Sequence, residues 1–423
     1  MYDLKPPSVY VFEHALADPR SAQRIERMLA ALGKDLASVE RVTDADIPRM
    51  IADNHWENAR WRQGRHPSHE DPSLVFSTIR YDDKPDVAAA TKACPTGTSS
   101  SLVRQLLGYA GRVIHNERPD SGRVCRSRHQ FDTIYGCPHG CKYCPGGMVS
   151  VINTNVEEFI ERDVIPIAEE NPWQKVFMFN SALSDTICFE PEYDMSKRLT
   201  EYYATTPDQH YLIHTKSANV DFMLDLDHQG RTIVLWSLSG RTPSRLVEPG
   251  SATTEERIEA AHKCQQAGFP VRIKFKPITP VRGWRDECRE MVELLFSKVQ
   301  PDNVGLCFIA WMSVGELKEC IDFDLLDPAY VAEMEAQADA MKGVVTGPFP
   351  PRLRAEVYGF YFDEIRKHSQ DVPVFLCTES REMWREFAPR LGLKAGNYAC
   401  GCGPQSPPGT RTLDRVLAPA ECA

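Results

Sequence analysis

The feature that most constrains this chain is a regular alternation of short apolar segments and longer helical segments between Arg126 and Met312. The apolar segments are each long enough for one buried strand, and they span residues 130–134, 175–180, 211–216, 232–237, 271–276 and 303–309. Helical periodicity fills most of the intervals, as in residues 155–170, 196–204, 254–266 and 285–296. Strands that alternate with helices build a parallel sheet covered by helices. We therefore predict an α/β fold, and six strand–helix units fit a partial (β/α)6 barrel.

The ends of these strands carry a set of polar residues. Ligands bind at the carboxyl ends of the strands in such sheets, so these residues are the first candidates for a binding site. They are Asn180, Ser181, Ser184 and Asp185 after the second strand, Thr215, Lys216 and Ser217 at the third, Ser237 and Ser239 at the fourth, and Lys274 and Lys276 on the fifth. A lone lysine at a strand end is usually solvated. Their coincidence on consecutive strands is what indicates a site.

The first predicted strand leads directly into a glycine-rich segment with three cysteines, Cys137, Cys141 and Cys144. Their C-x3-C-x2-C spacing suits a short loop around one cubane iron–sulfur cluster. Three thiolates are one fewer than a closed four-cysteine cluster or zinc site requires, so one iron would be open to a substrate or cofactor. Two alternatives stay open, which are a zinc site completed by His139 and purely structural thiols.

This cysteine motif, together with the strands that follow it, resembles the radical S-adenosylmethionine (SAM) enzymes. The resemblance implies that Cys137, Cys141 and Cys144 hold a [4Fe-4S] cluster and that SAM chelates its fourth iron, with Tyr143 near the adenine. A bound zwitterionic amino acid needs a cation near its carboxylate, and we predict Lys216 for this role. The other predicted SAM contacts are Ser181 and Ser184 for the amino group and Ser237 and Ser239 for the ribose.

A closer match is to spore photoproduct lyase and its relatives. The segments that resemble them are HTKSANVDFML, IVLWSLSG, EPGSATTEERIEAAHKCQQAGFPVRIKFKPITPVRGW and VFLCTESREMW. The resemblance extends over about residues 126–390 and is strongest between His214 and Trp284. It implies a partial (β/α)6 barrel with helices added on both flanks, and reductive cleavage of SAM. In that family the resulting 5′-deoxyadenosyl radical abstracts hydrogen from a thymine dimer in DNA.

Several positions depart from the family pattern. The repair enzymes return hydrogen through a cysteine in a Ser-Cys-x-Ser-Asp context, whereas this chain has Ala182 at that position. They also use a tyrosine directly after the third cluster cysteine, where this chain has Pro145. Neither alanine nor proline quenches a carbon radical as a thiol does, so the donor relay is missing. Ser239 stands where the family often has asparagine. Cys188 is a nearby substitute donor, with a buried structural thiol as the alternative.

Two flanking segments complete the predicted domain organisation. Residues 1–125 are expected to form a mainly helical extension, residues 126–312 the radical SAM barrel, and residues 313–423 an α+β extension that covers the barrel mouth. Near the C-terminus, Cys400 and Cys402 form a C-x-C pair. With Cys377 or Cys422 this pair is a candidate for a second cluster, a metal or an arsenical site. Alternatively, it supplies the missing thiol donor.

Composition limits the partners. The net charge of −10 argues against a broad surface for duplex DNA, because affinity for phosphates needs clustered Lys and Arg. The sequence has no apolar run long enough to span a membrane and no charged-then-apolar export signal at its start, so we expect a cytoplasmic protein without membrane partners. The 14 cysteines are then expected to be reduced thiols and cluster ligands rather than disulfides.

We therefore predict an enzyme that reductively cleaves SAM at a [4Fe-4S] cluster and abstracts hydrogen from a nucleoside, nucleotide or small biosynthetic substrate. An external one-electron reductant of the flavodoxin or ferredoxin type is implied. One alternative is photoproduct repair with a rearranged hydrogen donor. Another is a non-catalytic cluster or zinc protein that binds nucleic acid. Cleavage of a different carbon–sulfur bond of SAM, with transfer of its aminocarboxypropyl arm, also stays open.

Overall fold

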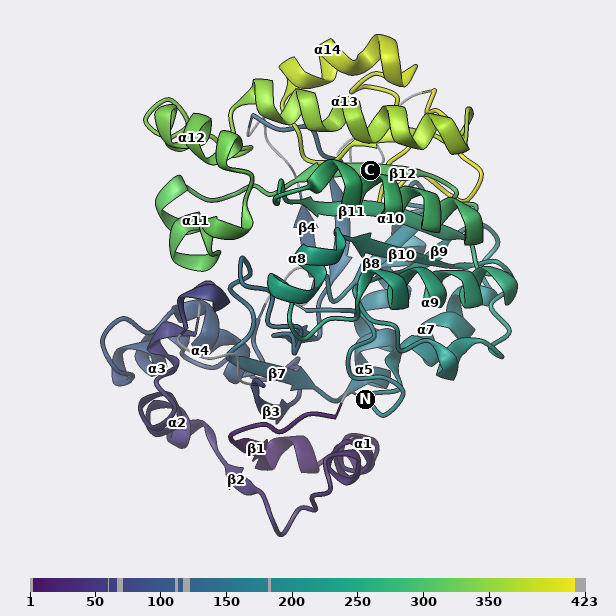
Figure 1. Cartoon of the computed structure of the whole chain (residues 1–423). Coiled ribbons are helices and arrows are strands. Elements are labelled where there is room, and N and C mark those ends of the chain that lie inside the picture. Colours follow the sequence, from purple (N-terminus) through teal and green to yellow (C-terminus); the bar gives the residue numbers. More distant parts are fainter. Residues whose placement is uncertain are drawn as a thin grey trace. The chain divides into compact units, whose positions relative to one another are not determined.

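The computed structural model describes residues 3–59, 61–66, 71–110, 113–116, 122–181 and 184–414 (Figure 1). The chain forms two compact units, each built from discontinuous stretches. Unit 1 comprises Met1–Ile114, Gln130–Glu170 and Phe179–Leu199, and unit 2 comprises His115–His129, Asn171–Met178 and Thr200–Ala423. The boundaries expected near residues 126 and 312 remain predictions.

Unit 1 contains a five-stranded sheet with the order β2-β1-β3-β7-β6. Its parallel strands are β1 (Val9–Phe12), β2 (Glu40–Val42), β3 (Ser73–Ser77) and β7 (Val149–Asn153), and β6 (Ile134–Tyr135) pairs antiparallel with β7. Strands β1, β2 and β3 lie in the segment predicted to be mainly helical, and that prediction overlooked them. Strands β1 and β3 are short and buried at every residue, so they show no apolar–polar alternation.

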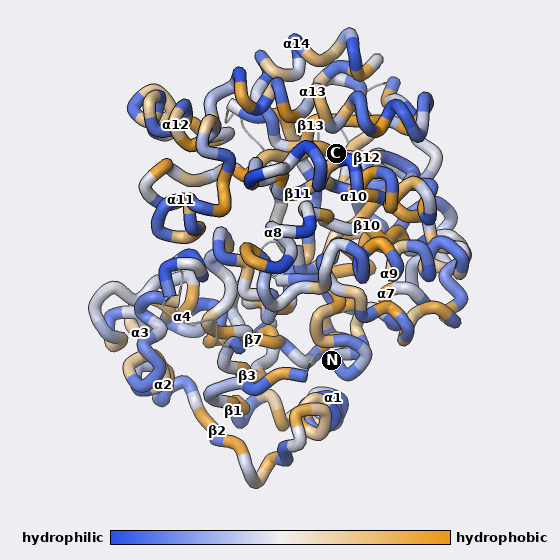
Figure 2. The backbone as a smooth tube through the Cα atoms, viewed as in Figure 1, coloured by the Kyte–Doolittle hydropathy of each residue, from blue (hydrophilic) through white to orange (hydrophobic). Residues whose placement is uncertain are grey.

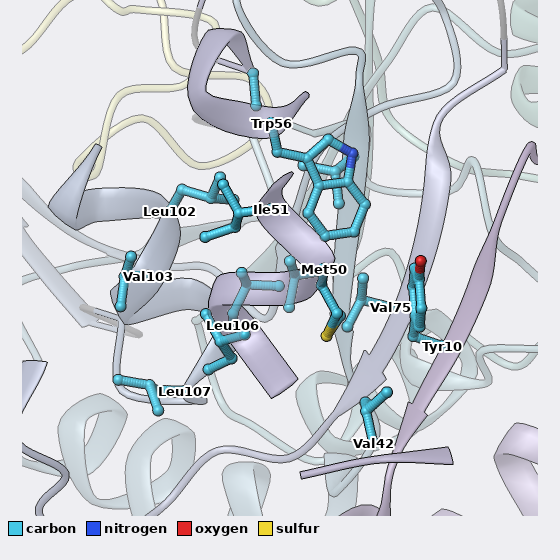
Figure 3. Packing of buried hydrophobic residues seen from close by; sticks show 14 of the residues in the cluster. Tyr10, Val42, Met50, Ile51, Trp56, Val75, Leu102, Val103, Leu106 and Leu107 are labelled. Carbon is cyan, nitrogen blue, oxygen red and sulfur yellow. The ribbon is translucent and has the colours of Figure 1, made fainter. Parts of the chain in front are cut away.

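The helices of unit 1 agree better with the sequence pattern. They are α1 (Pro19–Ala31), α2 (Ile47–Asp53), α3 (Val87–Ala93), α4 (Ser100–Leu106) and a continuous run of α5 (Val156–Phe159), a π-helical turn (Ile160–Val164) and α6 (Ile165–Glu170). Figure 3 shows Trp56, Met50 and Tyr10 in one hydrophobic cluster of this unit. The rings of Tyr10 and Trp56 meet edge to face with centroids 5.9 Å apart. Such packing stabilises the sheet that contains β7.

The second sheet has the strand order β13-β12-β11-β10-β9-β8-β5-β4. Its strands are β4 (Val113–Asn116), β5 (Arg128–Phe131), β8 (Val176–Phe179), β9 (His210–Thr215), β10 (Thr232–Leu238), β11 (Val271–Ile278), β12 (Val304–Phe308) and β13 (Val374–Leu376). The pairs from β8 to β13 are all parallel. The six predicted strands correspond to β5 and β8–β12, so the α/β fold with a parallel sheet is confirmed.

The remaining helices connect these strands. They are α7 (Met195–Ala204), α8 (Arg241–Leu246), α9 (Thr254–Gln266), α10 (Trp284–Lys298), α11 (Val314–Cys320), α12 (Pro328–Ala336), α13 (Pro351–His368) and α14 (Arg381–Leu391). Helix α9 begins as the sequence predicts, because Thr253 and Glu256 cap it reciprocally. On β11, Phe275 packs against Tyr361 of α13 with ring centroids 5.3 Å apart. The next residues along β11, Lys274 and Lys276, therefore point to the opposite face of the sheet.

Hydropathy follows this arrangement. Figure 2 shows hydrophilic and hydrophobic residues alternating along α9 and α10, as expected for helices with one buried side. Within the described residues, no helix combines the length and the apolar character needed to cross a membrane.

Candidate functional site

The cysteine loop, which we define as residues 136–148, joins β6 to β7 in unit 1. It starts at Gly136, whose φ of +129° is costly for a side chain, and a Cβ there would lie 2.1 Å from the carbonyl oxygen of Val149. The N–H of Cys137 donates to the carbonyl of Gly146 at 2.7 Å, and the N–H of Cys144 donates to the carbonyl of Cys141 at 2.8 Å. The loop is therefore closed on itself by its own backbone.

A segment far away in the sequence holds the third cysteine in place. The guanidinium of Arg62 donates to the carbonyl of Tyr143 at 2.7 Å, and the N–H of Gln63 donates to the carbonyl of Cys144 at 2.9 Å. The N–H of Gly64 donates to the carbonyl of Lys142 at 2.8 Å. This 62–64 segment was not identified from the sequence, because its contribution is mostly backbone hydrogen bonding, which has no sequence signature.

The thiols of the cysteine loop lie in different surroundings. Cys141 is buried, whereas Cys137 and Cys144 are half-buried. Loss of hydration and a hydrogen bond with Cys188 raise the pKa of Cys137 well above its ordinary value, against a lowering effect of His139. Cys188, the predicted substitute donor, is therefore a direct neighbour of a predicted cluster ligand. Its own thiol donates to the carbonyl of Asp185 at 3.3 Å.

The donor set of the loop suits an iron–sulfur cluster better than one zinc ion. Among the residues that the structure describes, no three His, Cys, Asp or Glu side chains converge as the ligands of a single metal ion would. A four-iron cluster takes each thiolate at a different iron, so its ligands need no common point. His139, the alternative zinc ligand, is buried, and its Nε2 lies within hydrogen-bond distance of the carboxylate of Asp185 at 3.0 Å.

The polar residues after β8 differ in their hydrogen bonding. The side chain of Asn180 accepts the N–H of Thr133 at 2.7 Å and that of Ile134 at 3.1 Å, so it fixes the entry to β6. The hydroxyl oxygen of Ser181 is buried and has no hydrogen-bond partner among the described residues. The hydroxyl of Ser184 lies 4.0 Å from the sulfur of Cys188. Ala182 and Leu183, where the donor cysteine is missing, lie outside the described residues.

In unit 2, Lys216 is held by a buried carboxylate. Its ammonium lies 2.5 Å from Glu248, which is fully buried, and donates to the carbonyl of Lys276 at 3.1 Å. Glu248 also accepts the hydroxyl of Ser239 at 2.9 Å and the guanidinium of Arg257 at 2.7 Å. Glu248 and Arg257 were missed from the sequence, although both lie in the segment that resembles the lyase family.

Ser237 is the remaining predicted SAM contact in unit 2. The hydroxyl of Ser237 lies 3.0 Å from Nε2 of His214. Ser237 stands opposite Lys274 in the β10–β11 register, so the two side chains share one face. Cys377, Cys400 and Cys402 are buried in this unit, and Cys422 lies outside the described residues. Within unit 2, Lys216, Ser237 and Ser239 thus lie at the ends of the neighbouring strands β9 and β10, whereas the C-x-C pair lies in the irregular segment after α14.

Comparison with known proteins agrees with this architecture. Residues 131–310 match the family model for spore photoproduct lyase. Spore photoproduct lyase of Bacillus subtilis is 30% identical over 173 residues, which cover 40% of this chain and 50% of the relative. That of Clostridium acetobutylicum is 23% identical over 195 residues, covering 44% of this chain and 58% of the relative. The chain thus spans about half the length of the curated relatives it matches.

Solved structures extend the likeness in fold. A single-residue mutant of spore photoproduct lyase superposes with a TM-score of 0.61 at 16% identity, covering 89% of this chain and 99% of that chain. Spore photoproduct lyase complexed with a dinucleoside spore photoproduct gives a TM-score of 0.59 with the same identity and coverage. At this identity the likeness concerns the fold.

Proposed function

We propose that this chain belongs to the spore photoproduct lyase family of the radical SAM superfamily, and that it reductively cleaves SAM and abstracts hydrogen from an organic substrate. The match of residues 131–310 to the family model supports this proposal. The substrate we favour is a nucleoside, a nucleotide or a small biosynthetic intermediate. The observation that carries the proposal is the closed C-x3-C-x2-C loop inside the family match. We further propose that β5 and β8–β12 form a partial (β/α)6 barrel, because their order in the sheet repeats their order in the chain.

In this proposal Cys137, Cys141 and Cys144 are the cluster ligands. When bound, the cluster supplies the electron that splits SAM into methionine and the 5′-deoxyadenosyl radical. The Gly146 carbonyl and the 62–64 segment satisfy backbone groups of the loop and so fix the backbone that carries its three cysteines. Pro145 provides no N–H and no phenol, so this turn contributes shape rather than a radical relay.

The site proposed for SAM in unit 2 has a suitable charge. Buried Glu248 carries one negative charge, and Lys216 and Arg257 together carry two positive charges against it. The excess positive charge favours an anionic carboxylate beside Lys216. The full set assigned to SAM is Tyr143, Ser181, Ser184, Lys216, Ser237 and Ser239.

The direct test measures 5′-deoxyadenosine after anaerobic incubation of cluster-loaded protein with SAM and a low-potential reductant. We expect the nucleoside to form with the wild type and to vanish in Cys141→Ala, while Cys264→Ala, a buried thiol outside the loop, behaves as wild type. A fully loaded wild type that releases no 5′-deoxyadenosine would refute the proposal. Zinc without iron or sulfide would instead favour the non-catalytic alternative.

Photoproduct repair is the second candidate, because a relative with this fold has been solved with a dinucleoside spore photoproduct. Repair by this chain would need a hydrogen donor in place of the missing cysteine. Cys188 is the nearest candidate in unit 1, since it contacts Cys137 and lies 4.0 Å from Ser184. Conversion of dinucleoside spore photoproduct to two thymidines by the wild type, lost in Cys188→Ala, would select this candidate. Formation of 5′-deoxyadenosine without repair would select the first.

A further inference from the structure

Unit 2 contains a buried sulfur that contacts two buried cations. The sulfur of Cys402 accepts a hydrogen bond from Nζ of Lys274 at 3.0 Å and one from Nη1 of Arg128 at 3.2 Å. The sulfur of Cys400 lies 3.9 Å away. Exposed fractions are 6% for Cys402, 3% for Cys400, 1% for Lys274 and 5% for Arg128, so water does not screen these contacts.

The surrounding chain fixes this geometry. Arg128 also donates to the carbonyl of Cys402 at 3.2 Å, and Arg272 donates to the carbonyl of Gly401 at 3.0 Å. A Cβ at Gly401 would lie 3.3 Å from Cε of Lys274 and 3.2 Å from Oδ1 of Asn303, so the spacer of the C-x-C pair lies tightly against β11. The two sulfurs are thus held on one side of a rigid strand.

The charges decide the protonation of the pair. Among the described residues, neither Lys274 nor Arg128 is paired with a carboxylate, and the ionisable group that both contact is the thiol of Cys402. A hydrogen bond from Cys400, together with Lys274 and Arg128, holds the pKa of Cys402 well below its ordinary value despite its burial. The same hydrogen bond and burial raise the pKa of Cys400. The pair is therefore one thiolate beside one thiol.

We propose that Cys400 and Cys402 form a dithiol–disulfide redox couple, with Cys402 as the attacking thiolate and Cys400 as the resolving thiol. The oxidant class is a low-molecular-weight disulfide, RSSR. The thiolate of Cys402 attacks one sulfur of RSSR and releases RS⁻, which leaves a mixed disulfide on Cys402. Cys400 then attacks the Cys402 sulfur of that mixed disulfide, its proton passes to the released thiolate, and the second RS⁻ leaves. In sum, one thiol, one thiolate and RSSR give the protein disulfide, RSH and RS⁻.

The structure also indicates where the equilibrium of this couple lies. Closing the bond shortens the sulfur–sulfur distance from 3.9 Å to about 2.05 Å. It also removes the thiolate of Cys402, so less negative charge balances the two buried cations Lys274 and Arg128. Cys377, whose pKa a hydrogen bond from Cys307 and the charge of Lys274 lower to about 5, is the anion that stays near Lys274. The reduced form is thus the stabilised one, so the couple is a strong oxidant once it is oxidised. Both the reactivity of Cys402 and the reduction potential of the couple should therefore depend on the charge of Lys274.

To test this proposal, the full-length protein is treated anaerobically with hydroxyethyl disulfide, and the modified thiols are located by peptide-resolved mass spectrometry. We expect a Cys400–Cys402 disulfide in the wild type, a stable mixed disulfide on Cys402 in Cys400→Ser, and no modification of Cys400 in Cys402→Ser. Cys264, whose pKa burial raises to about 12, serves as the unreactive internal control.

Two variants at one position separate charge from packing. Lys274→Met should slow modification of Cys402 at least about tenfold and shift the equilibrium toward the disulfide by a similar factor, equivalent to about 30 mV. Lys274→Arg keeps the charge and should retain the fast reaction. Cys307 and Cys377 are a second pair of buried thiols in unit 2 and form a hydrogen bond with each other. The proposal is overturned if Cys402 reacts no faster than Cys264 in folded protein, or if oxidation joins Cys307 to Cys377 while Cys400 and Cys402 stay free.

Discussion

The cysteine loop of unit 1 and the C-x-C pair of unit 2 place the same residue type in opposite electrostatic settings. In the loop, burial and a neighbouring thiol raise the pKa of Cys137. In the pair, a hydrogen bond and two cations lower the pKa of Cys402. Metal ligands and nucleophiles both act as thiolates, so Cys137 has to release a proton when iron binds, whereas the sulfur of Cys402 already lies beside the positive charge of Lys274. Spacing alone does not distinguish these roles, because the partners come from elsewhere in the chain.

The largest effect expected from this contrast concerns iron. Cys141→Ala should abolish cluster retention and 5′-deoxyadenosine formation, because two thiolates cannot replace three. Cys402→Ala should leave the iron content unchanged, since Cys402 lies outside the C-x3-C-x2-C motif and its sulfur is held by Lys274, Arg128 and Cys400. Iron and sulfide analysis after anaerobic reconstitution checks both expectations. Equal loss of iron in the two variants would show that the cysteine loop and the C-x-C pair do not differ in iron binding.

The next effect concerns thiol reactivity across pH. Cys402 should be alkylated by iodoacetamide at pH 7 at least about a hundredfold faster than Cys264, whose pKa is about 12. Because folding lowers the pKa of Cys402, its thiolate contributes stability above the unfolded pKa of about 8.5. That contribution is lost as the pH falls through the folded pKa. A rate for Cys402 that climbs tenfold per pH unit between pH 6 and 8 would contradict the assignment.

A smaller effect is expected at the 62–64 segment. Arg62→Ala removes the charged donor to the carbonyl of Tyr143, which contributes about 1.5–3 kcal/mol when buried. We expect iron to be lost about tenfold faster to a chelator, with the fold intact by circular dichroism. Arg65→Ala is the matched control, since Arg65 stacks on Trp61 at 4.3 Å. Identical chelation rates in the two variants would show that the segment does not hold the loop.

The smallest effect is expected at Ser181. Its hydroxyl has no partner among the described residues, so Ser181→Ala should change the free energy of unfolding by less than about 0.5 kcal/mol. If this hydroxyl contacts SAM, the same variant should raise the KM for SAM several-fold. Denaturant titration and steady-state kinetics measure the two quantities. A stable variant with unchanged KM would remove Ser181 from the proposed SAM site.

The sequence predicts the sheet of unit 2 well and that of unit 1 poorly, for a physical reason. Strands β9–β12 alternate with helices whose caps and periodicity are local signals, as at Thr253. Strands β1 and β3 are short apolar runs whose pairing partners are distant in sequence. A parallel pair of this kind leaves little local trace.

The residues of the candidate site also differ in how far the sequence identifies them. The three cysteines and Lys216 were identified because motif spacing and strand ends are visible in the sequence. Glu248, which holds Lys216, and Lys274, which lies 128 positions from Cys402, act through contacts that only folding creates. The cysteines and lysines could be identified from the sequence, whereas Glu248 and the contacts between these residues could not.

The 62–64 segment has a consequence for how iron can enter. A short peptide that carries only C-x3-C-x2-C lacks the donors that hold the carbonyls of Lys142, Tyr143 and Cys144. During synthesis, residues 62–64 leave the ribosome before residues 142–144, so this support is available when the cysteines emerge. We therefore expect loading of the proposed cluster to need this support, so that iron is delivered to a folded loop rather than to a bare stretch of polypeptide.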